Sequence, residues 1–206
     1  RIEKIDFKHE DKNKVLIKEE LKSLDKFNNI NSLINLNNAF TNKYYTITTK
    51  EGYLFKKPLI IYHSTTSSIY KKNINLRLDF KLENNSSLKL IDYFEDDSND
   101  NFINIFYNFD LAKNSILKNY KIDHKDNKNI KYSYNHIDQK ENSISETFIL
   151  SSGSSFLKNE IHCNLNEKYS SAFVNGIFKL DDFKNHEIKT NINHLNENTK
   201  SYQLVK

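Results

Sequence analysis

The sequence contains very few of the residues that interrupt regular secondary structure or cross-link the chain, with 3 glycines, 1 proline and 1 cysteine among 206 residues. The single cysteine, Cys163, excludes an intrachain disulfide framework and is compatible with a reducing compartment. Glycine is too rare for loops that cradle phosphate groups, and neither a P-loop nor a G-x-G-x-x-G pattern occurs. No apolar run approaches the roughly 20 residues that a membrane span needs. These absences favour a soluble protein without a nucleotide-binding loop.

Two further absences concern targeting and charge. The N-terminal stretch RIEKIDFKHEDKNK lacks the apolar segment of a signal peptide and does not begin with Met, so we expect a cytoplasmic protein represented by a fragment. The 31 basic residues are offset by 27 acidic ones, and the two signs are interspersed. Without a basic face, nucleic acid is not expected as a partner, and the lack of a spanning segment argues against a membrane partner.

Aromatic residues are abundant, with 14 Phe and 12 Tyr, which is enough apolar surface for one sizeable core. The only helical pattern lies in residues 12–40, where apolar residues recur at three- and four-residue steps: Leu21, Leu24, Phe27, Ile30, Leu33 and Ile34. Asn interrupts the pattern, because its side chain competes for backbone hydrogen bonds. We therefore expect an N-terminal helical segment over residues 1–42, with short helices, and a β-rich core over residues 43–206.

From Lys43 onward the apolar period changes to two residues, which is typical of strands. The stretch NLRLDFKL (75–82) aligns with NIFYNFDL (104–111) at an offset of 29 residues, and a serine recurs every 28 residues at Ser87, Ser115, Ser143 and Ser171. A period of about 20 to 50 residues indicates a solenoid, and because each unit is a strand, a polar turn and a strand, the array should be all-β. Asn tolerates the left-handed conformation that glycine otherwise supplies, which explains the Asn-rich turns. A β-helix satisfies this pattern, and a β-sandwich is the alternative.

Few groups of residues suggest metal chemistry. In EDDSNDN (95–101), Asp96, Ser98 and Asp100 have calcium-loop spacing, but Gly is missing at the sixth position and Tyr107 replaces the Glu at the twelfth. We interpret this stretch as an acidic surface loop. In IHC (161–163), alternation points Cys163 and His162 to opposite faces, so the cysteine should be a small buried hydrophobe. His124 and His136 lie in turn-like surroundings without ligand spacing, so no metal ligand is predicted.

Catalytic residues are equally hard to find. Many β-helices act on polysaccharides through exposed carboxylates, and the candidates for that role are Asp79, Asp92, Asp110 and Asp123. Outward charges are, however, what any solvated sheet face requires. No nucleophile motif occurs, and we predict no catalytic residue.

Near the C-terminus, HEIKTNINH (186–194) places two histidines on one strand. His186 and His194 have the same parity as Ile188, Thr190 and Ile192, so period-two alternation puts all five on one face. We expect both histidines to be structural, with hydrogen bonds near a corner of the rung.

Four stretches resemble one known family. They are SLINLNNAF (32–40), YYTITTKEGYLFKKPLIIYH (44–63), SSGSSFLKNEIHCNLNEKYSSAFVNGIFKLDD (151–182) and a histidine-rich run. In the third, Lys158, Asn159 and Glu160 resemble an Arg-Asn-Glu motif with Lys in place of Arg, and Asn175 and Gly176 resemble an Asn-Gly motif. The fourth, whose spacing is one residue shorter than in the family, consists of His186, Thr190, Ile192, His194, Thr199, Ser201 and Lys206. Over roughly residues 30–206, the chain resembles SufD, a core subunit of the SUF iron–sulfur cluster assembly machinery; its paralogue SufB usually carries Gly- and Cys-rich stretches that are missing here.

The resemblance implies a right-handed parallel β-helix that pairs with SufB and associates with the ABC ATPase SufC. It also implies a non-catalytic scaffold that binds no cofactor in this stretch, with the iron–sulfur cluster assembled transiently at the level of the complex. The family's cluster-site histidine would lie beyond Lys206 in a core truncated at its C-terminal end, so neither His186 nor His194 is expected to replace it. A carbohydrate-active or carbohydrate-binding β-helix and a simple interaction solenoid are the alternatives. A groove lined with carboxylates and aromatic platforms would favour the carbohydrate function.

Overall fold

The computed structural model describes residues 11, 13–21 and 31–206. Within these ranges the chain forms 13 β-strands and one α-helix. In chain order the elements are β1 (Val15–Leu21), α1 (Ser32–Phe40), β2 (Lys43–Thr49), β3 (Leu59–Thr65), β4 (Asn73–Leu82), β5 (Ser87–Asp96), β6 (Phe102–Leu111), β7 (Ile116–Asp123), β8 (Asn127–Gln139), β9 (Ile144–Ser151), β10 (Ser154–Leu165), β11 (Ser171–Phe178), β12 (Asn185–His194) and β13 (Lys200–Val205).

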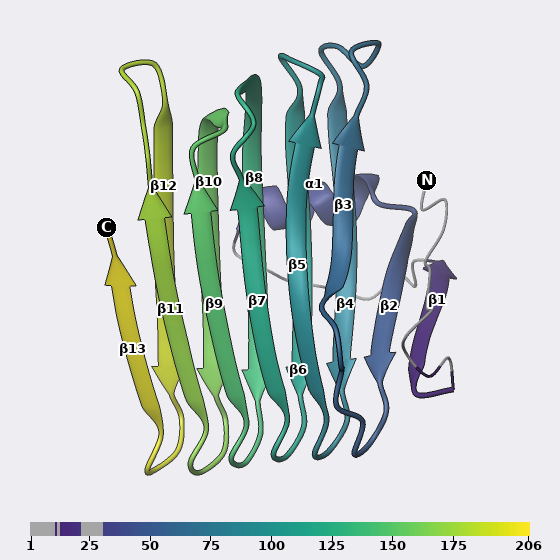
Figure 1. Cartoon of the computed structure of the whole chain (residues 1–206), viewed down its shortest axis with the longest axis vertical. Helices are drawn as coiled ribbons and strands as arrows, with labels where there is room; N and C mark the ends of the chain where they lie inside the picture. Colours follow the sequence, from purple (N-terminus) through teal and green to yellow (C-terminus); the bar gives the residue numbers. More distant parts are fainter. Residues whose placement is uncertain (1–10, 12, 22–30) are drawn as a thin grey trace.

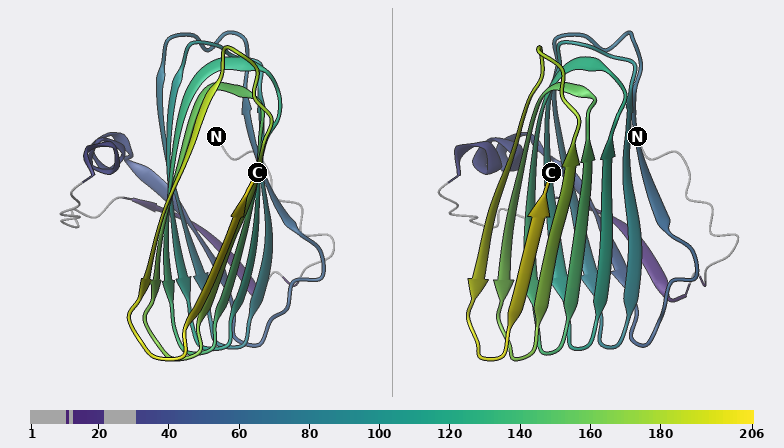
Figure 2. Two further views of the ribbon diagram at one scale, coloured as in Figure 1. Left: turned by 90° about the vertical axis from the view of Figure 1, so that its left-hand side faces the viewer. Right: turned by 60° about the vertical axis from the view of Figure 1, so that its left-hand side comes forward.

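The strands from β2 to β13 build a two-sheet parallel solenoid, shown in Figures 1 and 2. Sheet A has the order β1-β2-β4-β6-β8-β10-β12, and sheet B has the order β13-β11-β9-β7-β5-β3. The chain alternates between the sheets, so each consecutive pair from β2–β3 to β12–β13 forms one of 6 rungs. All these neighbours pair in parallel, and β1 alone is antiparallel, to β2. The predicted all-β parallel β-helix is therefore confirmed, and a β-sandwich is not formed.

The strand register confirms the repeat in sheet A, where Asn75 pairs with Asn104. In sheet B, however, Ser87 pairs with Ile116 and not with Ser115. The equivalent turn serines, whose Oγ donates to the carbonyl three residues earlier, are Ser86, Ser115, Ser143 and Ser170. The four serines spaced by 28 residues are therefore not all equivalent, because Ser115 and Ser143 are turn serines whereas Ser87 and Ser171 each follow one. Successive turn serines are 29, 28 and 27 residues apart, so the rungs differ in length. The turns at Ser86 and Ser170 each contain two adjacent serines, of which only the first is buried.

Asn supplies the left-handed turn conformation, as predicted. Asn85, Asn114, Asn142 and Asn198 have φ of 57°, 58°, 56° and 59°, and Tyr169 takes the corresponding place with φ of 62°. The side chains of neighbouring turns are also linked. The Nδ2 of Asn142 donates to Oδ1 of Asn114 at 2.8 Å, and Asn114 donates in the same way to Asn85 at 2.8 Å. The amide ladder therefore joins three rungs at the turns that lead from sheet A into sheet B.

The apolar core lies between the two sheets, where equivalent side chains stack from rung to rung. Phe80 on β4 and Phe109 on β6 are fully buried, and their rings stack with centroids 4.8 Å apart. Leu82 packs beside Leu111 in the next inward row, because the register pairs their backbones. The predicted alternation of these strands thus becomes a continuous core along the solenoid axis.

The described part of the N-terminal segment contains a strand as well as a helix. Among residues 11, 13–21 and 31–42, Ser32–Phe40 is the helical stretch, whereas Val15–Leu21 forms strand β1 and pairs with β2 over its whole length. The backbone N–H and C=O groups of Val15–Leu21 form hydrogen bonds with the free edge of β2. This tertiary pairing overrides the local helical pattern of the segment. Leu24, Phe27 and Ile30 lie outside the described residues.

Helix α1 packs on the outer face of sheet A through asparagines as well as apolar contacts. The Asn31 side chain caps the helix by accepting from the backbone N–H of Leu33. The Nδ2 of the fully buried Asn37 donates to the carbonyls of Leu76 (3.0 Å) and Asn104 (2.8 Å) on adjacent strands. The Asn residues that weaken the helical pattern therefore fix the helix to the sheet.

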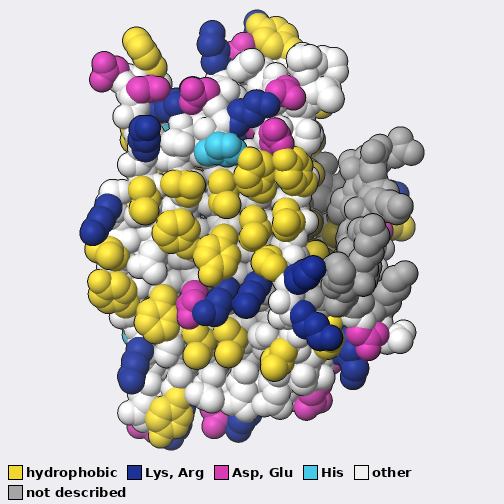
Figure 3. Space-filling model, viewed as in Figure 1, with side chains coloured by type: hydrophobic (Ala, Val, Ile, Leu, Met, Phe, Trp, Pro, Cys, Tyr) yellow, Lys and Arg dark blue, Asp and Glu magenta, His cyan; other side chains and the backbone are white. Residues whose placement is uncertain are grey.

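The outer faces of the two sheets differ in chemistry. On sheet A, α1 covers a small aromatic cluster in which Ile34 packs with Phe106, Tyr132 and Tyr134. On sheet B, Figure 3 shows apolar side chains gathered across the middle of the face, with charged side chains mainly above and below them. No described element lies over this face (Figures 1 and 2). Among the described residues, α1 is too short to cross a membrane, and no helix qualifies as a span.

Candidate functional site

Charged side chains are buried inside the solenoid, between sheets A and B. On β5, Asp92 and Asp96 have the same parity as Leu88 and Leu90, so alternation turns all four inward. On β7 the inward positions include Lys121 and Asp123, and on β8 they include Lys131. Each of these charged residues is at most 5 % exposed. Together they form two separate groups of buried ion pairs, one around Asp92 and one around Lys131.

The first group surrounds Asp92, which is fully buried. Lys121 Nζ donates to Oδ2 at 2.8 Å, the Tyr107 hydroxyl donates to the same oxygen at 2.5 Å, and His63 Nε2 lies 2.6 Å from Oδ1. Burial alone would raise the pKa of Asp92, but the charges of Lys121 and His63 outweigh it and hold the pKa well below its ordinary value. Burial also lowers the pKa of Lys121 and raises that of Tyr107. Asp92 is therefore a buried carboxylate fixed by three donors.

The second group is centred on Lys131. Its Nζ lies 2.6 Å from Asp96 Oδ2 and 3.0 Å from Asp123 Oδ1. The Ser154 hydroxyl donates to Asp123 Oδ2 at 2.7 Å. The backbone of the preceding residue, Gly153, therefore lies close to the Asp123 side chain. A Cβ at Gly153 would stand 2.6 Å from the backbone carbonyl oxygen of Lys125 and 2.8 Å from Asp123 Oδ1, so only glycine fits there.

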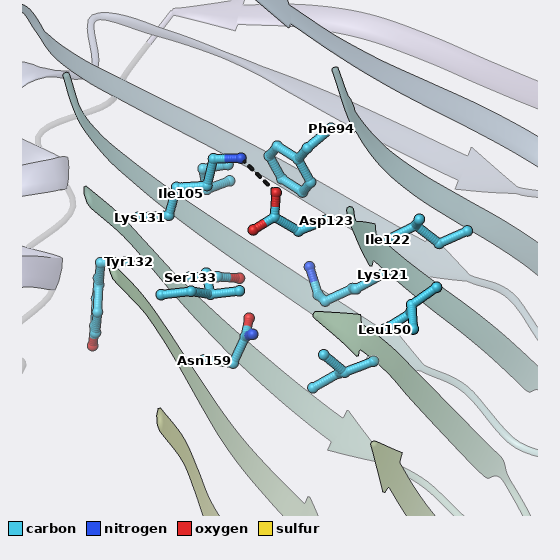
Figure 4. Close-up of a pocket in the computed structure, with 12 residues that line it drawn as sticks. Phe94, Ile105, Lys121, Ile122, Asp123, Lys131, Tyr132, Ser133, Leu150 and Asn159 are labelled. Atoms are coloured by element: carbon cyan, nitrogen blue, oxygen red, sulfur yellow. Dashed lines mark hydrogen bonds and ion pairs between the residues drawn. The ribbon is translucent and has the colours of Figure 1, made fainter. Parts of the chain in front are cut away.

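A small cavity separates the two groups (Figure 4). It has a volume of about 20 Å³, which is room for one water-sized molecule. Figure 4 shows Lys121, Lys131, Asp123, Ser133 and Asn159 around it, from strands of both sheets. None of the residues that line the cavity carries a thiol.

The sequence-predicted carboxylates are not gathered in one groove. Asp92 and Asp123 point inward, which corrects their interpretation as solvated outward charges. Asp79 is also buried, on the outer side of sheet A, in a double hydrogen bond with Arg77. Asp110 lies in the next outward row, where burial and the charge of Asp138 raise its pKa. These four residues therefore do not form the polysaccharide groove that the carbohydrate alternative requires.

The stretch EDDSNDN is not simply an acidic surface loop. Asp96 and Ser98 are 2 % and 1 % exposed, and Asp96 forms the ion pair with Lys131. Asp97 and Asp100 are exposed, as predicted. The error has a physical cause, because the strand alternation of β5 continues into the acidic run and carries every second residue into the interior.

Cys163 is buried, as predicted, and its thiol lies 3.2 Å from Gln139 Oε1. Burial raises the pKa of this thiol to about 12. His162 points outward, where its ring stacks with that of His136 at 5.5 Å. Residues 11, 13–21 and 31–206 contain no cluster of three or more His, Cys, Asp or Glu that could hold a metal ion.

The two C-terminal histidines lie at opposite ends of β12. His186 Nδ1 lies 2.8 Å from the Ser151 hydroxyl, and its Nε2 lies 2.6 Å from the carbonyl of Ser154. His194 contacts Thr199 and Ser201 across the following turn, at 2.7 and 3.0 Å. Both have the corner hydrogen bonds expected of structural histidines, and the absence of a direct role stays a prediction.

Sequence reasoning missed Lys121, Lys131, His63 and Tyr107. One signal was available for Lys121, which follows Asp92 by one repeat of 29 residues and pairs with it on the next rung. Opposite charges at inward parity, one repeat apart, indicate a buried pair. No comparable signal links Lys131 to Asp123, since they lie 8 residues apart on strands of different sheets.

Two parallel sheets whose strands alternate along the chain, enclosing a stacked core and buried ion pairs, define a β-solenoid protein. The sequence model of one family, described as SUF system FeS cluster assembly, SufBD core domain, matches residues 63–206. The chain therefore belongs to the SufBD core-domain family, whose members are scaffold-type components of SUF iron–sulfur cluster assembly. No match was found among curated proteins.

Proposed function

We propose that this chain is a non-catalytic scaffold subunit of the SUF machinery, of the SufD type, acting in the cytoplasm. The observation that carries the proposal is the family match over residues 63–206, which extends from β3 across the remaining rungs of the solenoid. The matched region is thus a continuous structural unit.

The chemistry of Cys163 supports a role without covalent catalysis. A thiol whose pKa is raised to about 12 is protonated at neutral pH, and only a thiolate attacks or accepts sulfur efficiently. The side chain is also 1 % exposed, which closes it to a donor protein. Iron–sulfur clusters are then a product of the complex, with none held by this stretch.

A SufB-type subunit and a SufC-type ABC ATPase are the proposed partners. The proposal is tested by co-expressing this chain, tagged, with the SufB-type and SufC-type proteins of the same genome and measuring what co-purifies. We expect a complex that contains all three. If the tagged chain purifies without the SufB-type and SufC-type proteins, although those two associate with each other in the same cells, the proposal is overturned. An unrelated tagged β-helix is the control for non-specific capture.

Cluster assembly by that complex tests the non-catalytic role separately. Cys163→Ser should leave the rate of assembly unchanged, and Cys163→Ala is the control for packing. If both variants bind their partners but abolish assembly, the cysteine takes part directly and the scaffold role is wrong.

A further inference from the structure

The outer face of sheet B carries two adjacent apolar lanes that run along the solenoid axis. The strand register aligns the first lane, Ile60, Ile91, Tyr120, Phe148, Asn175 and Leu204, and the second lane, Tyr62, Tyr93, Ile122, Leu150 and Ile177. Asn175 is the only polar member. Because each lane takes one residue from every rung it crosses, the lanes are a continuous surface and not a scatter of single side chains.

Several side chains of these lanes remain accessible. Tyr62 is 59 % exposed and Tyr120 38 % exposed, whereas Phe106 and Tyr132 under helix α1 are each 2 % exposed. The rings are held in place along the lanes, with Tyr62 stacked on Tyr93 at 5.0 Å. A parallel sheet is normally covered on both faces, and large exposed apolar patches mark interaction sites.

The same molecule shows how such a surface is covered. On sheet A, the aromatic cluster is buried by α1, an amphipathic helix that places Leu33 and Ile34 against it. No described element covers the lanes of sheet B, as Figures 1 and 2 show. A helix is therefore an occupant that this solenoid already accommodates on its other face.

The dimensions of the lanes also fit a helix. Six strands at about 4.8 Å spacing extend the first lane over about 24 Å. At about 1.5 Å per residue, this length corresponds to a helix of about 16 residues. Two lanes separated by one i, i+2 step, about 7 Å, match the apolar stripe of a single helix.

The two flanks of the lanes carry different charges. Beside the first lane lie Lys89, Lys118 and Glu146, two positive charges and one negative. Lys118 pairs with Glu146 at 3.0 Å, and Lys89 is exposed with no ion pair to another described residue. Beside the second lane, Glu95 accepts a hydrogen bond from Tyr62. A helix with acidic residues along the flank nearest Lys89 is thus favoured.

We propose that the apolar lanes of sheet B bind an amphipathic α-helix of a separate protein. Its apolar stripe is about 16 residues long, and its acidic flank faces Lys89. The inference goes beyond the scaffold role, since it stands on the geometry and charge of this face alone. Binding buries the exposed tyrosines as α1 buries the cluster on sheet A.

The test uses three labelled 16-residue peptides and fluorescence anisotropy with the whole chain. The first peptide is an amphipathic helix with Leu and Phe on one face and Glu along one flank. The second has Lys in place of those Glu residues, and the third has the composition of the first in scrambled order. We expect the first peptide to bind at least about tenfold more tightly than the others.

Variants then locate the binding site. Tyr120→Thr with Phe148→Thr should weaken binding of the Glu peptide by about tenfold or more, while Tyr70→Thr with Phe183→Thr removes the same residue types from exposed loops and should not change it. Lys89→Glu should reverse the preference between the Glu and Lys peptides. The proposal is overturned if the scrambled peptide binds as well as the first, or if the Tyr120 and Phe148 changes have no effect.

Light scattering of the free protein separates a second copy from a foreign helix. A monomer that binds the Glu peptide supports the proposal. If the protein is a dimer that dissociates on the Tyr120 and Phe148 changes, the lanes bind another copy of this chain and the proposal is wrong.

Discussion

The interior of the solenoid has an apolar half and a charged half, and the two are held together by different physics. The apolar half lies near the Asn turns and contains stacked pairs such as Phe80 with Phe109. The charged half lies toward the opposite end of the rungs and contains Asp92, Lys121 and Lys131. Removing part of an apolar stack leaves a cavity, whereas removing one ion leaves its partner buried without a counter-charge. The stability of the apolar half therefore depends on how completely its side chains fill the interior. The stability of the charged half depends on whether each buried charge keeps its counter-charge.

The largest single loss should come from the apolar half. Phe109→Ala is expected to lower the free energy of unfolding by about 4 kcal/mol, because the fully buried ring leaves a cavity between rungs. Urea unfolding at pH 7 and pH 4 should give the same loss, since no charge is involved. Phe183→Ala, at a side chain that is 92 % exposed, is the control and should change little.

Asp92→Asn should cost slightly less at neutral pH, about 3 kcal/mol, because Lys121 loses its buried counter-charge. Its pH dependence distinguishes the two halves. Folding lowers the pKa of Asp92 below its ordinary value of 3.8, so the stabilisation is present above that value and is lost as the pH falls toward the lowered one. The stability gap between wild type and variant should therefore narrow below about pH 4. A gap that stays constant, as for Phe109→Ala, would contradict the charge-balance account.

Tyr107→Phe separates hydrogen bonding from packing at the border of the two halves. The variant keeps the ring but removes the donor to Asp92 Oδ2, and we expect a loss of about 2 kcal/mol in chemical denaturation. In the Asp92→Asn background the same change should cost less, because the charged acceptor is gone. Equal losses in both backgrounds would show that the hydroxyl contributes independently of the charge on Asp92, and would contradict this account.

The smallest effect should occur at the turns beside the apolar half. Ser115→Ala removes the bond from Oγ to the carbonyl of Ala112 and should cost about 1 kcal/mol in thermal or urea unfolding. Ser171→Ala is the matched control, because Ser171 lies one place after the equivalent turn serine and its side chain makes no hydrogen bond with the described residues. If the two substitutions cost the same, the serine at the turn is not a structural requirement.

Much of the architecture could be predicted because the solenoid repeats. The 29-residue offset between NLRLDFKL and NIFYNFDL is the register of β4 and β6, and alternation places Cys163 inside. The N-terminal strand was not predictable in the same way. Val15–Leu21 becomes a strand by pairing with β2, a contact to residues that are remote in sequence.

The charged interior was the larger failure of sequence reasoning. Asp92 and Asp96 have inward parity, but a charged residue in an alternating strand is normally assigned to solvent. Their burial is tolerated because Lys121 and Lys131 come from other strands at hydrogen-bond distance. A single strand does not contain that information, since the partner of each carboxylate lies on a neighbouring rung or on the opposite sheet.

The repeating strand-and-turn unit, the Asn turns and the inward parity of each strand follow from the order of the residues alone, because all three depend on residues close together along the chain. Tertiary structure decided which charges meet inside, where α1 packs, and which outer face remains apolar and uncovered. Those outcomes depend on register between rungs, and shifting one turn by a single residue, as at Ser86 and Ser170, changes which side chains become neighbours.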